Sequence, residues 1–96
     1  MKGFFLPDGR NTRLMPGDQI IFTPTDNGPE IITFYRDGQR LFPDVPPHSL
    51  MADGAQYPRR LVHAERMLIA KLIGVATGTE VRVLELGEKR TIFQFI

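Results

Sequence analysis

The chain has 96 residues, of which 42% are hydrophobic and 24% are charged, a composition that excludes the disordered class. This length predicts one domain, residues 1–96, and the absence of cysteine excludes disulfides, thiolate catalysis and zinc fingers. The formal net charge of +1 gives the whole molecule no strong signature of polyanion binding.

The N-terminal apolar run is too short for a signal peptide, and no run approaches the length of a membrane span. We therefore expect a cytoplasmic protein of bacterial or phage-like character that does not contact a membrane. No catalytic or metal-binding motif is present, so we expect no cofactor, no metal site and no catalytic residue.

The first half of the chain reads as short strands and turns. Residues 3–6 are a short apolar run stopped by a Pro-Asp-Gly turn, which predicts a first strand. A second turn, Pro16-Gly17-Asp18, precedes residues 19–23, whose β-branched and aromatic residues predict another strand.

Residues 30–42 predict a hairpin, because Asp37-Gly38 is a typical two-residue type I′ turn. This turn places Arg36 opposite Gln39, Tyr35 opposite Arg40, and Phe34 opposite Leu41. We expect Phe34 and Leu41 on the core side. Residues 43–57 are rich in Pro, Gly and Ala and predict a long connection.

Residues 58–73 predict the helix around which the fold is organised, beginning near Pro58 and ending at Gly74. At about 100° per residue, one half of this helix is apolar and predicts a core face. Its members are Leu61, Val62, Ala64, Leu68, Ile69, Leu72 and Ile73. Glu65 falls near the middle of this apolar half, where it either bonds to Arg82 or a loop N–H or lies at the edge of the contact.

Residues 80–96 predict a second hairpin with its turn at Gly87-Glu88, which places Glu85 opposite Arg90 and Val83 opposite Ile92. In its second strand both faces are apolar, with Ile92 and Ile96 on one side and phenylalanines on the other. Such a strand is expected to be covered on both faces.

The helix also carries the local basicity of the chain, since residues 58–73 have a net charge of +3. The predicted basic face is a candidate binding surface for nucleic acid or a partner, and the alternative is an ordinary solvated helix face. Its members are Arg59, Arg60, His63, Arg66 and Lys71.

Aromatic residues are numerous for a domain of this size, and some could form a partner surface unless the core takes them all. The candidate partner surface comprises Tyr35, Arg40, Phe93 and Phe95.

We expect an α+β fold, a small partly closed antiparallel β-barrel or roll of about six strands with one α-helix inserted before the last hairpin. The nearest architecture by analogy is an SH3-like or OB-like barrel, and the alternative is a β-grasp arrangement. For function we expect a non-enzymatic binding or adaptor module that contacts a protein partner or itself. The alternatives are a nucleic-acid-binding regulator that uses the basic face and, more remotely, a small enzyme centred on Glu65.

Overall fold

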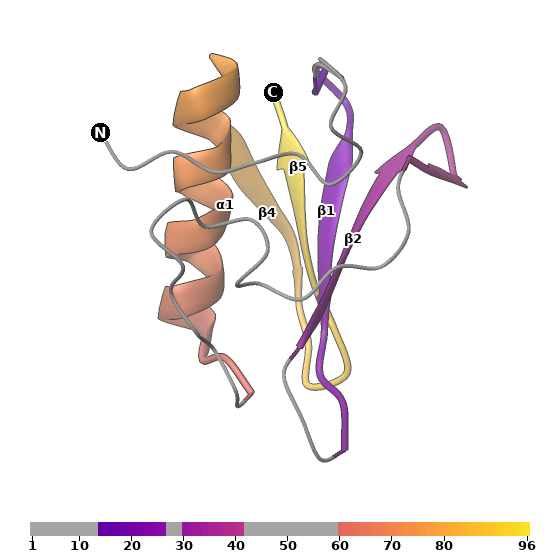
Figure 1. Ribbon diagram of the computed structural model, residues 1–96, viewed down its shortest axis with the longest axis vertical. Helices are drawn as coiled ribbons and strands as arrows, with labels where there is room; N and C mark the ends of the chain where they lie inside the picture. Colours follow the sequence, from indigo (N-terminus) through magenta and orange to yellow (C-terminus); the bar gives the residue numbers. More distant parts are fainter. Residues whose placement is uncertain (1–13, 27–29, 42–59) are drawn as a thin grey trace.

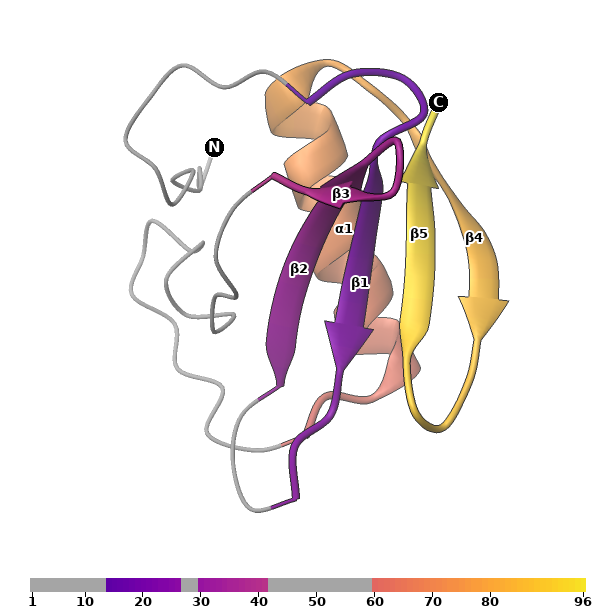
Figure 2. The same cartoon turned by 90° about the vertical axis from the view of Figure 1, so that its right-hand side faces the viewer.

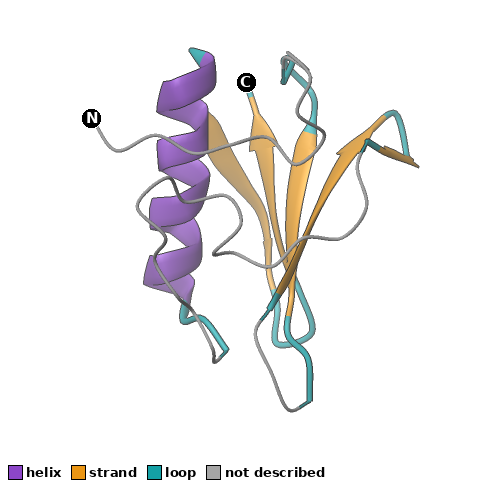
Figure 3. Cartoon of the chain, viewed as in Figure 1, coloured by secondary structure: helices purple, strands orange, loops and turns teal. Residues whose placement is uncertain are grey.

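A computed structural model describes residues 14–26, 30–41 and 60–96, in which one α-helix packs on one face of an antiparallel sheet (Figures 1 and 3). The predicted strand at residues 3–6, the connection at residues 43–57 and Arg59 lie outside the described residues. The α+β class and the position of the helix before the last hairpin are confirmed.

The described strands form a five-stranded sheet in the order β3-β2-β1-β5-β4. Their bounds are β1 Gln19–Thr23, β2 Ile31–Arg36, β3 Gln39–Arg40, β4 Val81–Leu86 and β5 Thr91–Phe95. All neighbouring pairs are antiparallel. The helix α1 spans His63–Thr77.

The sheet that these strands form is not closed into a barrel, so the expectation of an SH3-like or OB-like barrel is wrong for the described part of the chain. β3 and β4 are the two ends of the strand order. Figure 2 shows β2, β1, β5 and β4 side by side, with the short β3 crossing the upper ends of β2 and β1. β3 has only two residues. Closure into a barrel needs the two edge strands to pair, and β3 and β4 do not pair with each other.

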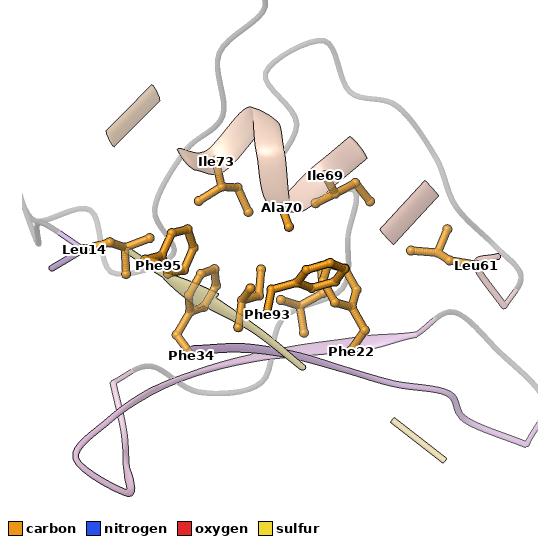
Figure 4. Close-up of a cluster of buried hydrophobic side chains, with 11 residues drawn as sticks. Leu14, Phe22, Phe34, Leu61, Ile69, Ala70, Ile73, Phe93 and Phe95 are labelled. Carbon is orange, nitrogen blue, oxygen red and sulfur yellow. The ribbon is translucent and has the colours of Figure 1, made fainter. Parts of the chain in front are cut away.

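Alternation along three strands builds the core (Figure 4). Side chains of β1, β2 and β5 that point toward α1 are buried, as the period of two along a strand requires. They are Ile20, Phe22, Ile32, Phe34, Phe93 and Phe95. Phe22 and Phe93 make an edge-to-face contact with ring centroids 5.7 Å apart.

The Asp37-Gly38 hairpin is confirmed, and Tyr35 pairs with Arg40 as predicted. Both turn residues have positive φ, 52° and 77°, as a type I′ turn requires. The N–H of Leu41 donates to the carbonyl of Phe34, and Leu41 packs against the core.

The predicted ends of the helix are wrong in the described region. Residues 60–62 are not helical, and α1 begins at His63 after the cap residue Val62. It continues through Gly74 and ends at Gly78, which has the left-handed φ of 79° typical of a C-terminal glycine. Gly74 instead allows the backbone of Thr79 to pack closely against the helix, because a Cβ at this position would lie 2.8 Å from the carbonyl oxygen of Thr79.

The predicted core face of the helix is only partly right. Leu61, Ile69 and Ile73 are buried, but Val62, Ala64 and Leu68 are exposed. Apolar residues occur nearly all round α1, so its sequence does not select one side. The buried stripe is Arg66, Ile69, Ala70 and Ile73, at the i, i+3, i+4, i+7 spacing of one helix face.

The register predicted for the last hairpin is wrong. Glu85 pairs with Ile92 and Val83 with Phe93, and the ladder is irregular between Val83 and Glu85, where Leu84 forms a bulge. The N–H of Gly87 donates to the carbonyl of Arg90 at 2.9 Å. Gly87 therefore closes the loop, and Glu88 and Lys89 occupy its tip.

Candidate interaction surface

Arg66 lies at the centre of a buried ionic cluster at the N-terminal end of α1. Its side chain is buried, with 1% of the residue exposed, and it pairs with Glu30, which is fully buried beside the start of β2. Its Nε lies 2.9 Å from Glu30 Oε1 and 3.1 Å from Oε2, and a second guanidinium nitrogen contacts Oε2. The pair crosses from the helix to the sheet and fixes their separation at this end.

Neighbouring groups complete the hydrogen bonding of this pair. Arg66 Nη1 donates to Thr91 Oγ1 at 2.8 Å, and the N–H of Leu61 donates to Glu30 Oε2 at 3.2 Å. His63 Nδ1 lies 3.4 Å from Arg66 Nη1. A buried charge is tolerated only where it is paired and hydrogen-bonded, and the Arg66–Glu30 pair meets that condition.

The predicted basic face is therefore not a single surface. The prediction that Arg66 lies on an exposed face is wrong, because its charge is neutralised inside the protein. Arg60 and His63 are exposed and share a shallow pocket of about 260 Å³ with Arg66. Arg60 Nη2 also donates to the carbonyl of Glu88 at 2.9 Å. Lys71 is exposed but lines a separate pocket.

Glu65 has a local structural partner. Its Oε1 accepts a hydrogen bond from the N–H of Val62 at 3.0 Å, which satisfies a backbone donor at the start of the helix. This is the reciprocal half of a capping box, since Val62 itself has no side-chain acceptor. The expectation that Glu65 bonds to a loop N–H is confirmed, whereas its predicted place in the middle of the core face is wrong.

The candidate partner surface is divided between the two faces of the sheet. Tyr35 is half-buried and Arg40 is exposed, and they lie opposite each other in the β2–β3 hairpin. Phe93 and Phe95 are buried under α1, so the prediction that they present a surface to a partner is wrong. Both rings belong to the core because every second residue of β5, namely Thr91, Phe93 and Phe95, points toward the helix.

Exposed apolar side chains are concentrated on α1 and β4. Among the described residues, eight large hydrophobic side chains are exposed, and six of them belong to α1, its cap residue or β4. We define the α1–β4 surface by five of these: Leu68, Val75, Val83, Leu84 and Leu86.

A pocket of about 300 Å³ joins the two elements of this surface. Lys71 and Val75 of α1 line one wall, and Val81 of β4 lines the other. Thr79 and Glu80, which connect the two elements, complete it. Within the described part of the chain, the buried hydroxyl of Thr79 has no hydrogen-bond partner. The surface is thus hollowed where α1 and β4 adjoin.

The opposite face of β4 carries charge. Arg82 donates to Gln94 Oε1 through Nε at 3.1 Å and Nη2 at 2.7 Å. Glu85 Oε2 accepts from Arg90 Nε at 2.7 Å, and this hydrogen bond raises the pKa of Arg90. All four side chains are at least partly exposed, so these contacts are open to solvent.

A third ion pair joins the end of β2, at Arg36, to the turn before β1, at Asp18. Arg36 Nη2 lies 2.8 Å from Asp18 Oδ2, which also accepts from the N–H of Met15. The hydrogen bond to Asp18 raises the pKa of Arg36, so the stabilisation is complete below the ordinary arginine pKa. This contribution of Arg36 is lost as the pH rises through its folded-state pKa, so Arg36 is charged at neutral pH.

Sequence reasoning missed Glu30 and Thr91 as partners of Arg66. Glu30 stands directly before a strand and Thr91 opens another, positions that carry no signal of burial. It also missed the exposure of Leu68 and Val75, because the period of a helix does not say which apolar side meets the sheet. The apolar content of β4 is evident from the sequence, but the sequence does not show that β4 lies at the edge of the sheet.

No known protein family, curated protein or solved structure matches this chain. Within residues 14–26, 30–41 and 60–96, no three His, Asp or Glu residues are grouped so that they could hold a metal ion. The helix in the described part of the chain is not long and apolar enough to cross a membrane.

Proposed function

We propose that this domain is a non-enzymatic protein-binding module that associates with itself or with another protein through the α1–β4 surface. The observation that carries the proposal is the clustering of exposed apolar side chains on these two elements. Leu68, Val75 and Leu86 are 56%, 61% and 57% exposed. Large apolar patches on a soluble domain usually mark interaction sites, since burying them releases about 25 cal/mol per Å².

The two edges of the described sheet differ in a way that supports the same surface. β3 has two residues, Gln39 and Arg40, and both are polar and exposed. Short length and charge are typical protections of an edge strand against pairing with other chains. β4 has six residues and four of them are apolar. It is the edge that is better suited to accept a partner.

The nucleic-acid alternative has weaker support. Arg66 is paired with Glu30 in the core and is not available for phosphates. Arg60, His63 and Lys71 remain exposed, and Arg60 also donates to the backbone of Glu88. Replacing both Arg60 and Lys71 by Glu tests this alternative. Retention of single- or double-stranded DNA at low salt by the wild type, and its loss in the variant, would favour it.

The protein-binding proposal is tested with Leu68→Lys and Leu86→Lys, two changes at exposed positions on the two elements. Each is expected to change the free energy of unfolding by less than about 0.5 kcal/mol, because neither side chain is in the core. Self-association is measured by analytical ultracentrifugation. Association with other proteins is measured by affinity capture with the wild type and each variant as bait.

The matched control is Met15→Lys, since Met15 is 47% exposed and lies outside α1 and β4. We expect association to survive in Met15→Lys and to be lost or strongly weakened in the other two variants. The proposal is wrong if Leu68→Lys and Leu86→Lys bind as the wild type does in both assays.

A further inference from the structure

We infer that the partner at the α1–β4 surface is a second copy of this chain, joined by antiparallel pairing of β4 with β4 of the other copy. This inference rests on the proposed function, because it names the partner of the same surface. The first step is the edge itself. Among the described strands β4 pairs only with β5, so the backbone groups on its other side point away from the sheet (Figure 2).

The bulge at Leu84 arranges the side chains of β4 in a symmetric order. Arg82 pairs with Gln94 and Glu85 with Ile92, two residues of β5 that lie on the face away from α1. Val83 pairs with Phe93, on the helix side. In a regular strand residues 82 and 85 would lie on opposite faces. The extra residue at Leu84 brings both charges to the same face.

The sequence Val81 to Leu86 is consequently self-complementary about its centre. When two copies run antiparallel around a two-fold axis between Val83 and Leu84, Arg82 lies opposite Glu85 of the second copy, and the same pair recurs on the other side of the axis. Val81 then lies opposite Leu86, and Val83 opposite Leu84. Opposite charges and apolar side chains facing each other across strands are both stabilising.

Symmetry also explains why a second copy fits better than an unrelated strand. A regular strand could follow β4 only by skipping a residue at the bulge, as β5 does. A second copy has its bulge at the same place, so both strands have equal numbers of residues on each side of the axis. Residues that lie opposite each other across the axis then have their side chains on the same face of the joined sheet.

The existing contacts of the two charges are compatible with this pairing. Arg82 uses Nε and Nη2 on Gln94, which leaves further guanidinium N–H groups for a carboxylate. Glu85 accepts from Arg90, and a carboxylate has acceptor positions for a second donor. In the dimer the two sheets form one continuous sheet, with both helices on the same face, and the apolar side chains of β4 gain neighbours across the axis.

The experiment uses charge reversal on the full chain. Arg82→Glu places like charges opposite each other twice in a homodimer, and Glu85→Arg does the same with the opposite sign. By analytical ultracentrifugation we expect the wild type to dimerise and each single variant to have a dissociation constant raised about ten-fold or more. The double variant Arg82→Glu/Glu85→Arg is expected to regain the wild-type constant within about three-fold.

A mixture of the two single variants gives the sharpest result. In a mixed dimer every charged pair is again opposite in sign, so the mixture is expected to form heterodimers at concentrations where each variant alone is mainly monomeric. Lys89→Glu is the matched control, because it makes the same change of charge at the hairpin tip, outside the pairing. We expect it to dimerise as the wild type does. Circular dichroism of each variant checks that the fold is retained.

The possible results separate the two proposals. A wild type that is monomeric at about 300 μM, or single variants whose mixture forms no heterodimer, overturns the β4 pairing. If Leu68→Lys abolishes binding while the charge reversals do not, the α1–β4 surface remains the binding surface and the second copy is the wrong partner arrangement. If neither set of changes alters any association, both proposals fail.

Discussion

Arg66 is the residue whose environment differs most from what its sequence indicates. It sits in the buried stripe of α1, one turn before Ile69 and Ala70, in a position that an apolar residue would normally occupy. Glu30, thirty-six residues earlier, supplies the opposite charge. A pair this far apart in the sequence is formed only when the helix has docked on the sheet, so it reports on tertiary structure.

The pair predicts a strong asymmetry between single and double substitutions. Arg66→Met or Glu30→Leu leaves the remaining charge buried without its partner, and each is expected to lower the free energy of unfolding by about 3–5 kcal/mol. The double variant replaces both charges by apolar groups and is expected to lose much less than the sum of the two. Urea unfolding of the four proteins measures the coupling.

A surface pair provides the control for this cycle. Arg90 and Glu85 are joined by a hydrogen bond of 2.7 Å, but both side chains are exposed. Arg90→Met is expected to leave stability nearly unchanged, because solvent screens exposed ion pairs. If the Arg66 and Glu30 costs add without coupling, the two side chains do not stabilise each other in the folded state, contrary to the structure.

At the scale of the elements, the two glycines near the end of α1 have different roles. Gly78 supplies the positive φ of the C-terminal cap, and Gly74 lies inside the helix against the carbonyl of Thr79. In an ordinary helix interior Gly→Ala raises stability by about 0.5–1 kcal/mol. Here Gly74→Ala is expected to lower it by about 1–3 kcal/mol, because the new Cβ would displace backbone.

Gly78→Ala serves as the comparison, since nothing lies within 4 Å of a Cβ at that position. Its cost comes only from the left-handed backbone and is expected to be about 1 kcal/mol. Thermal and urea unfolding of both variants distinguish steric from conformational cost. A stabilised Gly74→Ala protein would show that α1 and the connector to β4 can separate without penalty.

Local chemistry made some elements predictable from sequence. Asp37-Gly38 defines a type I′ turn on its own, so the β2–β3 register followed from two residues. The turn at Pro16-Gly17-Asp18 and the strand after it were likewise signalled by residues in direct succession. These predictions depended on contacts between neighbours in the chain.

Long-range geometry was not predictable in the same way. Gly74 and Gly78 both suit a helix end, and only the packing of Thr79 decides between them. Gly87 was predicted at a turn position, yet it forms the closing pair of the loop with Arg90. Only glycine fits there easily, since a Cβ would lie 2.9 Å from the carbonyl oxygen of Arg90. The bulge at Leu84 has no marker in sequence. The last hairpin was therefore predicted out of register, by two residues at Glu85 and by one residue at Val83, on the other side of the bulge.

At the scale of the whole molecule, α1 has more apolar surface than one sheet can cover. The helix packs against β4 and β5, and its buried stripe shares one core with side chains of β1, β2 and β5, while Leu68 and Val75 remain exposed. A helix that is hydrophobic nearly all round is usually enclosed. These exposed apolar side chains would be covered if the folded unit contained more than one chain. The oligomeric state therefore decides how the fold should be interpreted.

Dimerisation makes thermal stability depend on protein concentration. A partner that binds only the folded chain stabilises it, so the Tm of the wild type is expected to rise as its concentration increases from about 1 to about 300 μM. In Arg82→Glu like charges oppose each other across the pairing and weaken the dimer. The Tm of this variant is expected to stay nearly constant over the same range. The equimolar mixture of Arg82→Glu and Glu85→Arg is expected to recover the dependence. Differential scanning fluorimetry measures all three, and a wild-type Tm independent of concentration would contradict the β4 pairing.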